Sequence, residues 1–235
     1  MSSHEWGTAP EFVGPRHELR ERLLLDLFLS ASPGPEVLDA GAGQGTMSAR
    51  LERLGYEVTS TDVSGTAVET LRARLWGPVT EASVTDLPFA NESFDGAVLG
   101  EVLEHVEDDR GGLAELARVL RPGGVLALSV PANPRLHGPS DEWAGHVRRY
   151  TRSALIEACT SAGLTVHRCV GWGFPFSRLY HRHLYERYLD RHGPSWPGGR
   201  HRHLVAVVGA LLQVDRLFVG VERGALGYLL LATRP

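Results

Sequence analysis

The stretch VLDAGAGQG, residues 37–45, places three glycines and one carboxylate directly after a short apolar run. An apolar strand that ends in alternating glycines brings backbone close to a bound nucleotide in α/β proteins, because glycine lets the chain turn sharply without a Cβ. A dinucleotide fingerprint requires the spacing G-x-G-x-x-G, whereas this loop has Gly41, Gly43 and Gly45, followed by Thr46. The spacing therefore argues against a nicotinamide dinucleotide.

Charge near this loop favours a cationic cofactor. Asp39 stands just ahead of the loop where a pyrophosphate would have to lie, and its carboxylate would repel that group. S-adenosylmethionine instead carries an ammonium and a sulfonium, which a carboxylate attracts. Asp62 follows the next apolar run, close to the offset of about 20 residues at which an acid meets ribose hydroxyls in such folds. Asp86 follows a third run; we expect it to accept from an adenine amino group, with the Leu87 N–H donating to the ring. Three acids at three strand ends predict one pocket.

Length and composition limit the class of protein. A chain of 235 residues with 43% hydrophobic and 22% charged content is long enough for one domain with a large core. The net charge of −4 comes without a clustered basic face, which argues against a nucleic-acid partner. There is no lysine, which excludes lysine-nucleophile chemistry, and the first thirty residues do not resemble a signal peptide. We expect a cytoplasmic protein with no transmembrane segment.

Hydrophobic periods of two and 3.6 alternate along the chain, which predicts βαβ units and a parallel sheet covered on both faces. The expected strands are 36–40, 57–62, 79–84, 94–100, 123–130, 164–172 and 224–234, and the expected helices include 16–29, 46–54, 64–75 and 153–163. A helical insert separates the last two strands. The predicted fold is a single doubly wound α/β domain over 1–235, with a helical segment at 1–34, a cofactor-binding core at 35–174, the insert at 175–222 and a final strand at 223–235.

The ordered set VLDAGAGQG, TSTDVS, VTDLPF, FDGAVLGEVLEHV and LRPGG resembles the class I S-adenosylmethionine-dependent methyltransferases of the small-molecule, ubiquinone-biosynthesis-like type. The resemblance runs from about Pro35 to Gly163 and implies a Rossmann-like seven-stranded sheet whose last strand is antiparallel. It implies that the glycine loop holds the methionine end, that Asp62 holds the ribose and that Asp86 faces the adenine. The full set of predicted cofactor contacts is Asp39, Gly41, Gly43, Gly45, Asp62, Val63, Asp86, Leu87, Glu101 and Arg16.

Methyl transfer from a sulfonium requires the acceptor to be held in line and its proton to be removed. In GEVLEHVEDD, Glu101, Glu104 and His105 have the spacing i, i+3 and i+4, which predicts one side of a helical turn, and His146 follows in a later segment. The pattern resembles metal-dependent members of the family, so Glu101, Glu104, His105 and His146 are candidate ligands for Mg²⁺ or a similar divalent ion. Without a metal, His105 or His146 is the expected base.

The sequence therefore predicts a methyltransferase that acts on a small-molecule acceptor, most simply on a hydroxyl. Alternatives are N-methylation of an amino sugar or another amine, a catalytically silent cofactor-binding module, and a nicotinamide-dependent dehydrogenase. The insert is expected to cap the active site and to select the acceptor, which could be an apolar or lipid-linked molecule. A homodimer formed through the apolar surface of the insert is a further option. Arg16 is expected to pair with the cofactor carboxylate.

Overall fold

The computed structural model describes residues 15–187 and 202–235 and contains one seven-stranded sheet with the order β3-β2-β1-β4-β5-β7-β6. The strands are β1 Glu36–Ala40, β2 Glu57–Asp62, β3 Val79–Glu81, β4 Phe94–Gly100, β5 Leu120–Pro131, β6 Thr165–Trp172 and β7 Gly227–Thr233. The first five strands are parallel, and β7 runs antiparallel between β5 and β6. This topology confirms the predicted fold class.

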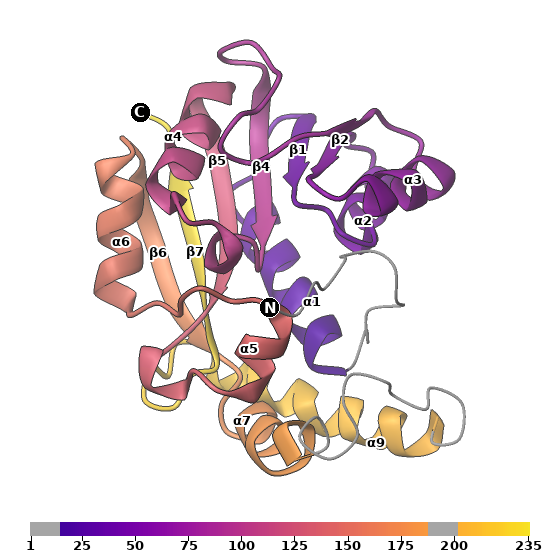
Figure 1. Ribbon diagram of the computed structural model, residues 1–235, viewed down its shortest axis with the longest axis vertical. Helices are drawn as coiled ribbons and strands as arrows, with labels where there is room; N and C mark the ends of the chain where they lie inside the picture. Colours follow the sequence, from indigo (N-terminus) through magenta and orange to yellow (C-terminus); the bar gives the residue numbers. More distant parts are fainter. Residues whose placement is uncertain (1–14, 188–201) are drawn as a thin grey trace.

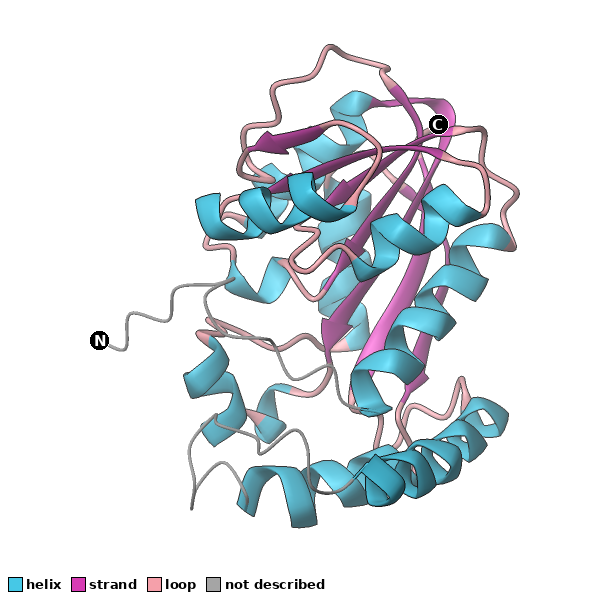
Figure 2. Ribbon diagram, turned by 90° about the vertical axis from the view of Figure 1, so that its right-hand side faces the viewer, coloured by secondary structure: helices cyan, strands magenta, loops and turns pink. Residues whose placement is uncertain are grey.

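Helices cover both faces of the sheet and create two apolar cores (Figures 1 and 2). On one face, α4 (Asp109–Val119) and α6 (Arg152–Ser161) pack on alternate side chains of the central strands. On the other face, α1 (Pro15–Leu29) and α2 (Thr46–Arg53) pack on the remaining side chains. Because successive residues of a strand point to opposite faces and both faces are covered, the central strands are mostly apolar, with the buried Asp39 of β1 and Ser129 of β5 as exceptions.

At the carboxyl ends of the parallel strands, the chain turns through loops and helices that follow or carry the predicted site residues Asp62, His105 and His146. Helix α3 (Gly65–Arg74) follows β2, and its N-cap Ser64 accepts a hydrogen bond from the Ala67 N–H. The 3-10 helix η1 (Leu103–His105) follows β4. After β5 come η2 (Pro134–Leu136) and α5 (Pro139–Ala144). This edge of the sheet is where ligands bind in open α/β folds.

The predicted helical insert is present between β6 and β7. It contains α7 (Phe176–Tyr180), a π-helical turn η3 (His181–Tyr185), α9 (Arg202–Leu212) and η4 (Gln213–Phe218). Asp215 is fully buried in η4 and accepts hydrogen bonds from the N–H groups of Phe176 and Ser177, at 2.9 and 2.7 Å. Helix α9 packs against α1, which covers one face of the sheet, and the insert helices α7 and α9 lie below the sheet in the view of Figure 1. Within the described ranges, no helix has the length and apolar character needed to cross a membrane.

Candidate active site

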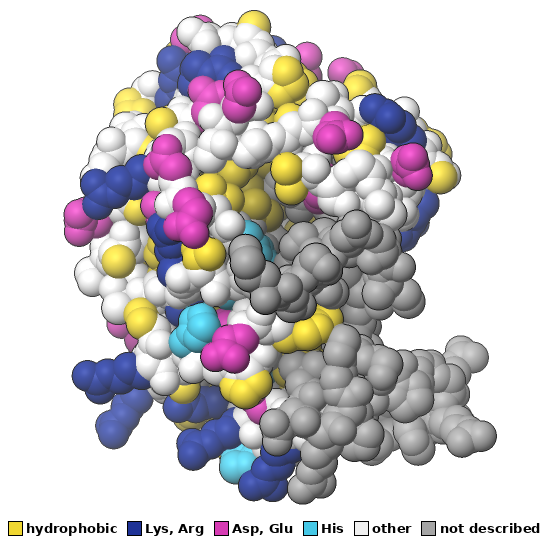
Figure 3. Space-filling view, in the orientation of Figure 1, with side chains coloured by type: hydrophobic (Ala, Val, Ile, Leu, Met, Phe, Trp, Pro, Cys, Tyr) yellow, Lys and Arg dark blue, Asp and Glu magenta, His cyan; other side chains and the backbone are white. Residues whose placement is uncertain are grey.

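A cavity of about 1090 Å³ opens at the carboxyl ends of β1, β2 and β4. The glycine loop, the end of β2, η1, α5, α1 and the insert all contribute to its wall. In the space-filling view, apolar side chains show in a hollow near the middle of the face (Figure 3). The volume is at the upper end of the range of about 300–1,000 Å³ that is common for small-molecule sites. The cavity therefore has room for a cofactor together with an acceptor.

The glycine loop is tied to the neighbouring strand and packed tightly from two sides. The N–H groups of Gly41 and Ala42 both donate to the Thr61 carbonyl at 2.8 Å. Gly41 has a φ of +71°, and a Cβ there would lie 2.5 Å from a methyl of Val102. Gly45 has a φ of +72°, and a Cβ there would lie 2.7 Å from Leu71 of α3. At these two positions a residue with a Cβ is disfavoured twice, because the positive φ strains its backbone and because the Cβ would clash with a neighbouring side chain.

Asp39 lies at the bottom of the cavity with 3% of its surface exposed. Its carboxylate accepts a hydrogen bond from the Ser48 hydroxyl at 2.5 Å, and Ser48 in turn accepts from Ser60 at 2.9 Å. Burial raises the pKa of Asp39 to about 7, and the nearby carboxylates of Glu21 and Asp62 act in the same direction. A cationic ligand beside Asp39 would lower the pKa of this carboxyl and so favour its ionised form.

Asp62 ends β2 and orders the loops on both sides of it. One carboxylate oxygen accepts the Gly43 N–H and the other accepts the Ser64 N–H, both at 2.9 Å. Asp62 and the following Val63 line the cavity. Two backbone donors therefore hold the Asp62 carboxylate in place. Its contact with a ribose remains a prediction.

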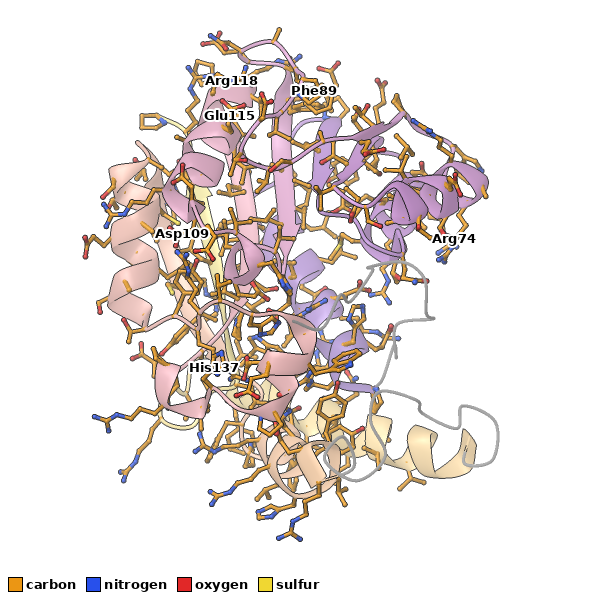
Figure 4. The ribbon with its side chains drawn as sticks, viewed as in Figure 1. Arg74, Phe89, Asp109, Glu115, Arg118 and His137 are labelled. Atoms are coloured by element: carbon orange, nitrogen blue, oxygen red, sulfur yellow. The ribbon has the colours of Figure 1, made fainter. Side chains whose placement is uncertain are left out.

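The loop after β3 corrects one predicted contact. The Leu87 N–H donates to Glu115 at 3.0 Å, so it is not directed to a ligand ring as expected. Glu115 and Arg118 lie together on α4 beside the loop that carries Phe89, and Arg118 donates to the Phe89 carbonyl at 2.7 Å (Figure 4).

Asp86 is exposed and is not among the residues that line the cavity. Residues 83–86 form a tight turn, in which the Asp86 N–H donates to the Ser83 carbonyl at 3.0 Å. The cavity wall after β3 consists instead of Ala82, Ser83, Val84 and Thr85.

Glu104 is the most unusual charged residue of the site, because its side chain is completely buried. Neither carboxylate oxygen receives a hydrogen bond from any residue that the structure describes. Burial, with the nearby Glu101 carboxylate, raises the pKa of Glu104 well above its usual value. Buried polar atoms are normally satisfied, so the two unpartnered oxygens suit either a protonated carboxyl or the binding of a cation.

Glu104, His105 and His146 form a cluster whose potential ligand atoms all lie within 4.8 Å of one another. The two imidazole rings are nearly perpendicular, with centroids 4.7 Å apart, and His146 Nε2 is 3.9 Å from Glu104 Oε1. Burial and the neighbouring His146 lower the pKa of His105 to about 4. His105 is therefore neutral at pH 7, the form in which imidazole binds a metal.

Glu101 does not join this cluster, which corrects the expected four-ligand arrangement. The helical turn begins only at Leu103, and Glu101 precedes it in a left-handed conformation with a φ of +58°. The i, i+3 relation to Glu104 therefore does not apply. Glu101 lines the cavity and faces Arg20 of α1, with a nitrogen-to-oxygen distance of 3.7 Å.

Arg16 also lines the cavity, on the side of the insert. Its guanidinium lies 2.8 Å from Nδ1 of His181 and 5.1 Å from the ring centroid of Tyr185. The predicted pairing of Arg16 with a cofactor carboxylate remains a prediction. Arg20, one helical turn further and therefore on the same face of α1, is a second arginine that the spacing of a helix could have identified.

Several cavity residues carry no signal in the sequence. They come from elements that are distant along the chain and become neighbours only through the fold. This group comprises Glu21, Ser83, Ser140, Trp143, Trp172 and Tyr185. One further acid, Asp141, is fully buried behind His146 and Arg149.

Comparison with known proteins agrees with this geometry. Residues 38–128 match the family described as "Methyltransferase domain". The ubiquinone biosynthesis O-methyltransferase of Hahella chejuensis is 31% identical over 194 residues, which cover 69% of this chain and 80% of that protein. O-methyltransferase resE of Aspergillus sclerotiorum is 39% identical over 110 residues, and demethylmenaquinone methyltransferase of Clavibacter sepedonicus is 40% identical over 105 residues. Each of these two alignments covers 43% of this chain, and the chain spans 41% and 43% of their respective lengths.

Solved structures share the fold across nearly the whole chain. The N-methyltransferase NodS from Bradyrhizobium japonicum, in complex with S-adenosylhomocysteine, aligns with a TM-score of 0.64 and 18% identity over 98% of this chain and 95% of NodS. An S-adenosylmethionine-dependent methyltransferase from Mesorhizobium loti has the same score and identity over 94% of this chain and all of its own. Sheet order, glycine loop and sequence relatives together establish that the chain belongs to the class I S-adenosylmethionine-dependent methyltransferases.

Proposed function

We propose that the protein transfers a methyl group from S-adenosylmethionine to a hydroxyl of a small-molecule acceptor, assisted by a divalent cation bound at Glu104, His105 and His146. The observation that carries this proposal is the buried Glu104 carboxylate, which has two unsatisfied oxygens beside two imidazoles. The names of the Hahella and Aspergillus relatives, both O-methyltransferases, support oxygen as the acceptor atom.

The donor set is suited to a divalent cation. One carboxylate and two imidazoles are typical ligands of Zn²⁺ in catalytic sites, and they also suit Mn²⁺, whereas Mg²⁺ prefers oxygen ligands. A cation bound by these three residues would lower the pKa of an acceptor hydroxyl and so favour the nucleophilic oxygen anion. The chain itself contributes a neutral His105 and a fixed position for His146.

The cofactor end of the cavity is assigned to the glycine loop side. Asp39 offers a carboxylate to the cofactor ammonium, and the positive charge of the ligand would stabilise the ionised form of that carboxylate. Asp62, already held by two backbone donors, offers its remaining lone pairs to ribose hydroxyls. The fixed loop positions the donor, and methyl transfer itself depends on alignment with the acceptor oxygen.

The acceptor end is assigned to the insert side of the cavity, where the wall is partly apolar. Leu24, Trp172 and Leu226 lie there together with the aromatic rings of Trp143 and Tyr185. Such a wall favours an acceptor with a ring or an alkyl portion, and the insert would determine which acceptor enters.

The test combines metal binding with product analysis. Wild type, Glu104→Gln and Glu157→Gln are titrated with Zn²⁺ and Mn²⁺; Glu157 is a matched control because its side chain is 69% exposed and lies outside the cavity wall. Methyl-labelled S-adenosylmethionine is then incubated with each protein and a small-molecule extract, with and without chelator. We expect label on product oxygen that requires the cation and is lost in Glu104→Gln only. Chelator-insensitive labelling of a nitrogen would contradict both the cation and the acceptor type.

A further inference from the structure

We propose that Asp141 is a positioning residue that holds His146 in one tautomer, with the proton on Nδ1 and the lone pair of Nε2 directed at Glu104 and His105. This inference rests on the proposed function for what Nε2 then does, but the tautomer itself is a property of the protein alone. Asp141 lies outside the residues that the sequence motifs identify.

Asp141 is fully buried and surrounded by donors. One carboxylate oxygen, Oδ1, accepts from Nδ1 of His146 and from Nε of Arg149, both at 2.7 Å. The other oxygen, Oδ2, accepts the Gly138 N–H at 2.9 Å. An ionised carboxylate only accepts hydrogen bonds, and the Arg149 guanidinium supplies its counter-charge. The group at 2.7 Å on His146 must therefore be an N–H donor.

This contact determines what the other ring nitrogen can do. In a neutral imidazole one nitrogen donates and the other accepts, so a proton fixed on Nδ1 leaves a lone pair on Nε2. His146 Nε2 lies 3.9 Å from Glu104 Oε1, and the ring is nearly perpendicular to that of His105. The Nε2 lone pair therefore points toward Glu104 and His105, which is the orientation that a metal ligand or a general base requires.

The local backbone explains why residue 141 can reach residue 146. Helix α5 ends at Gly145, which has a φ of +73°, and the chain turns back so that the His146 N–H donates to the Asp141 carbonyl at 2.9 Å. The next N–H, of Val147, donates to the Glu104 carbonyl at 2.8 Å. The segment is thus anchored both to α5 and to η1, and the imidazole lies between the two carboxylates.

A simple structural role for Asp141 makes a different prediction. If Asp141 served only to neutralise Arg149, removal of either partner would disturb the site equally, because each leaves the other charge buried and unpaired. If Asp141 positions His146, removal of Asp141 changes the tautomer, whereas removal of Arg149 leaves the bond between Asp141 and His146 in place.

The primary experiment reads the tautomer directly. Protein with ¹⁵N-labelled histidine is examined by two-bond ¹H–¹⁵N correlation, and the His146 signals are assigned by their loss in His146→Gln. We expect the Nδ1–H form in wild type and in Arg149→Met, and a shift toward the Nε2–H form in Asp141→Asn. The matched control is Asp95→Asn, which removes a carboxylate that also accepts from an arginine and a backbone N–H, at the other end of β4.

A second measurement is the affinity of each variant for Zn²⁺ alone. Loss of a carboxylate that orients a metal-ligating histidine typically lowers metal affinity roughly 10- to 100-fold, and we expect a loss of this size in Asp141→Asn but not in Asp95→Asn. An Nε2–H signal in wild type overturns the proposal, even if no variant folds. An unchanged tautomer in folded Asp141→Asn, or equal changes in Asp141→Asn and Arg149→Met, also overturns it.

The two proposals fail separately. If wild type has no measurable affinity for Zn²⁺ but its His146 tautomer depends on Asp141, the cation in the proposed function is wrong and the positioning role is supported. If Zn²⁺ binds equally well to wild type and Asp141→Asn, with the tautomer unchanged, the positioning role is wrong and the cation site is supported.

Discussion

The pKa of Asp39 makes the stability of the cofactor-free protein depend on pH. Because burial raises this pKa from 3.8 to about 7, the folded state holds a proton that the unfolded state releases. The free energy of unfolding should therefore fall as the pH rises from about 4 to about 7, by about 4 kcal/mol at most. Asp39→Asn should remove this part of the pH dependence and be more stable than wild type at pH 8, as measured by urea unfolding between pH 5 and pH 8.

Asp95 provides a control of opposite sign. Its hydrogen bond from Arg121 lowers the pKa of Asp95, so Asp95→Asn should lose stability at neutral pH, where the native carboxylate is ionised. A cation that pairs with ionised Asp39 should also bind more tightly as the pH rises toward about 7. Equal pH profiles for wild type and Asp39→Asn would contradict the assigned state of Asp39.

Gly41 differs from an ordinary turn glycine because its missing side chain makes room for Val102. Gly41→Ala should lower the free energy of unfolding by roughly 2–5 kcal/mol, from a strained φ together with overpacking. Gly55→Ala is the matched variant, because Gly55 also has a positive φ, of +93°, but has nothing within 4 Å of the added methyl. Gly55→Ala should lose about 1–2 kcal/mol, from backbone strain alone.

The difference between these two variants measures how the glycine loop and η1 depend on each other. Val102 directly precedes η1, so a shift of Val102 in Gly41→Ala should also weaken Zn²⁺ binding at Glu104 and His105. Calorimetric titration of both variants tests this. Equal stability loss in the two variants would show that Val102 moves aside without consequence.

At the scale of elements, the insert is anchored by a cap that comes from within the insert itself. Asp215 of η4 accepts the first free N–H groups of α7, so Asp215→Ala should leave the buried Ser177 N–H and the partly buried Phe176 N–H unsatisfied. We expect a loss of about 1–3 kcal/mol and faster hydrogen exchange across residues 175–187, with little change in cofactor affinity.

An exposed cap is the appropriate comparison. Asp108 caps α4 by accepting the Gly111 N–H at 2.9 Å, and Asp108→Ala should increase exchange in α4 while leaving the insert unchanged. If exchange in the insert is the same in Asp215→Ala and wild type, α7 is held by its apolar contacts instead.

The elements also show where sequence reasoning succeeds and where it stops. The glycine spacing, the Ser64 cap and the two late strands are local patterns, and the structure has each of them at its expected place. The positions of Glu101 and Leu87 depended on a helix start and on a partner in α4, which local spacing does not specify. Asp141 was not predicted because its role depends on a turn that returns the chain to His146.

At the scale of the whole molecule, a ligand that binds only the folded state should stabilise the fold by an amount set by its concentration relative to its dissociation constant. S-adenosylhomocysteine at about 100 times its dissociation constant should add about 2.7 kcal/mol to the free energy of unfolding. For a domain of this size that corresponds to a rise of roughly 5–11 °C in melting temperature. NAD⁺ at the same concentration should produce no comparable shift in a thermal melt, and a larger shift with NAD⁺ would instead support the dehydrogenase alternative.

The expected homodimer through the insert and the apolar or lipid-linked acceptor both remain predictions at this scale. Both predictions concern the surface of the insert. The sheet and the cavity are each formed by residues of a single chain, so neither feature tests these predictions.

The position of β7 has a consequence for how the protein is made. In the part of the chain that the structure describes, β6 pairs only with β7, and β7 also completes the hydrogen bonding of β5. On the ribosome, the first five strands can assemble as they emerge, but β6 has no neighbour until residues 227–233 leave the exit tunnel. A nascent chain stalled before Gly227 would therefore expose the outer edge of β5 and a wholly unpaired β6, both of which could pair with other chains.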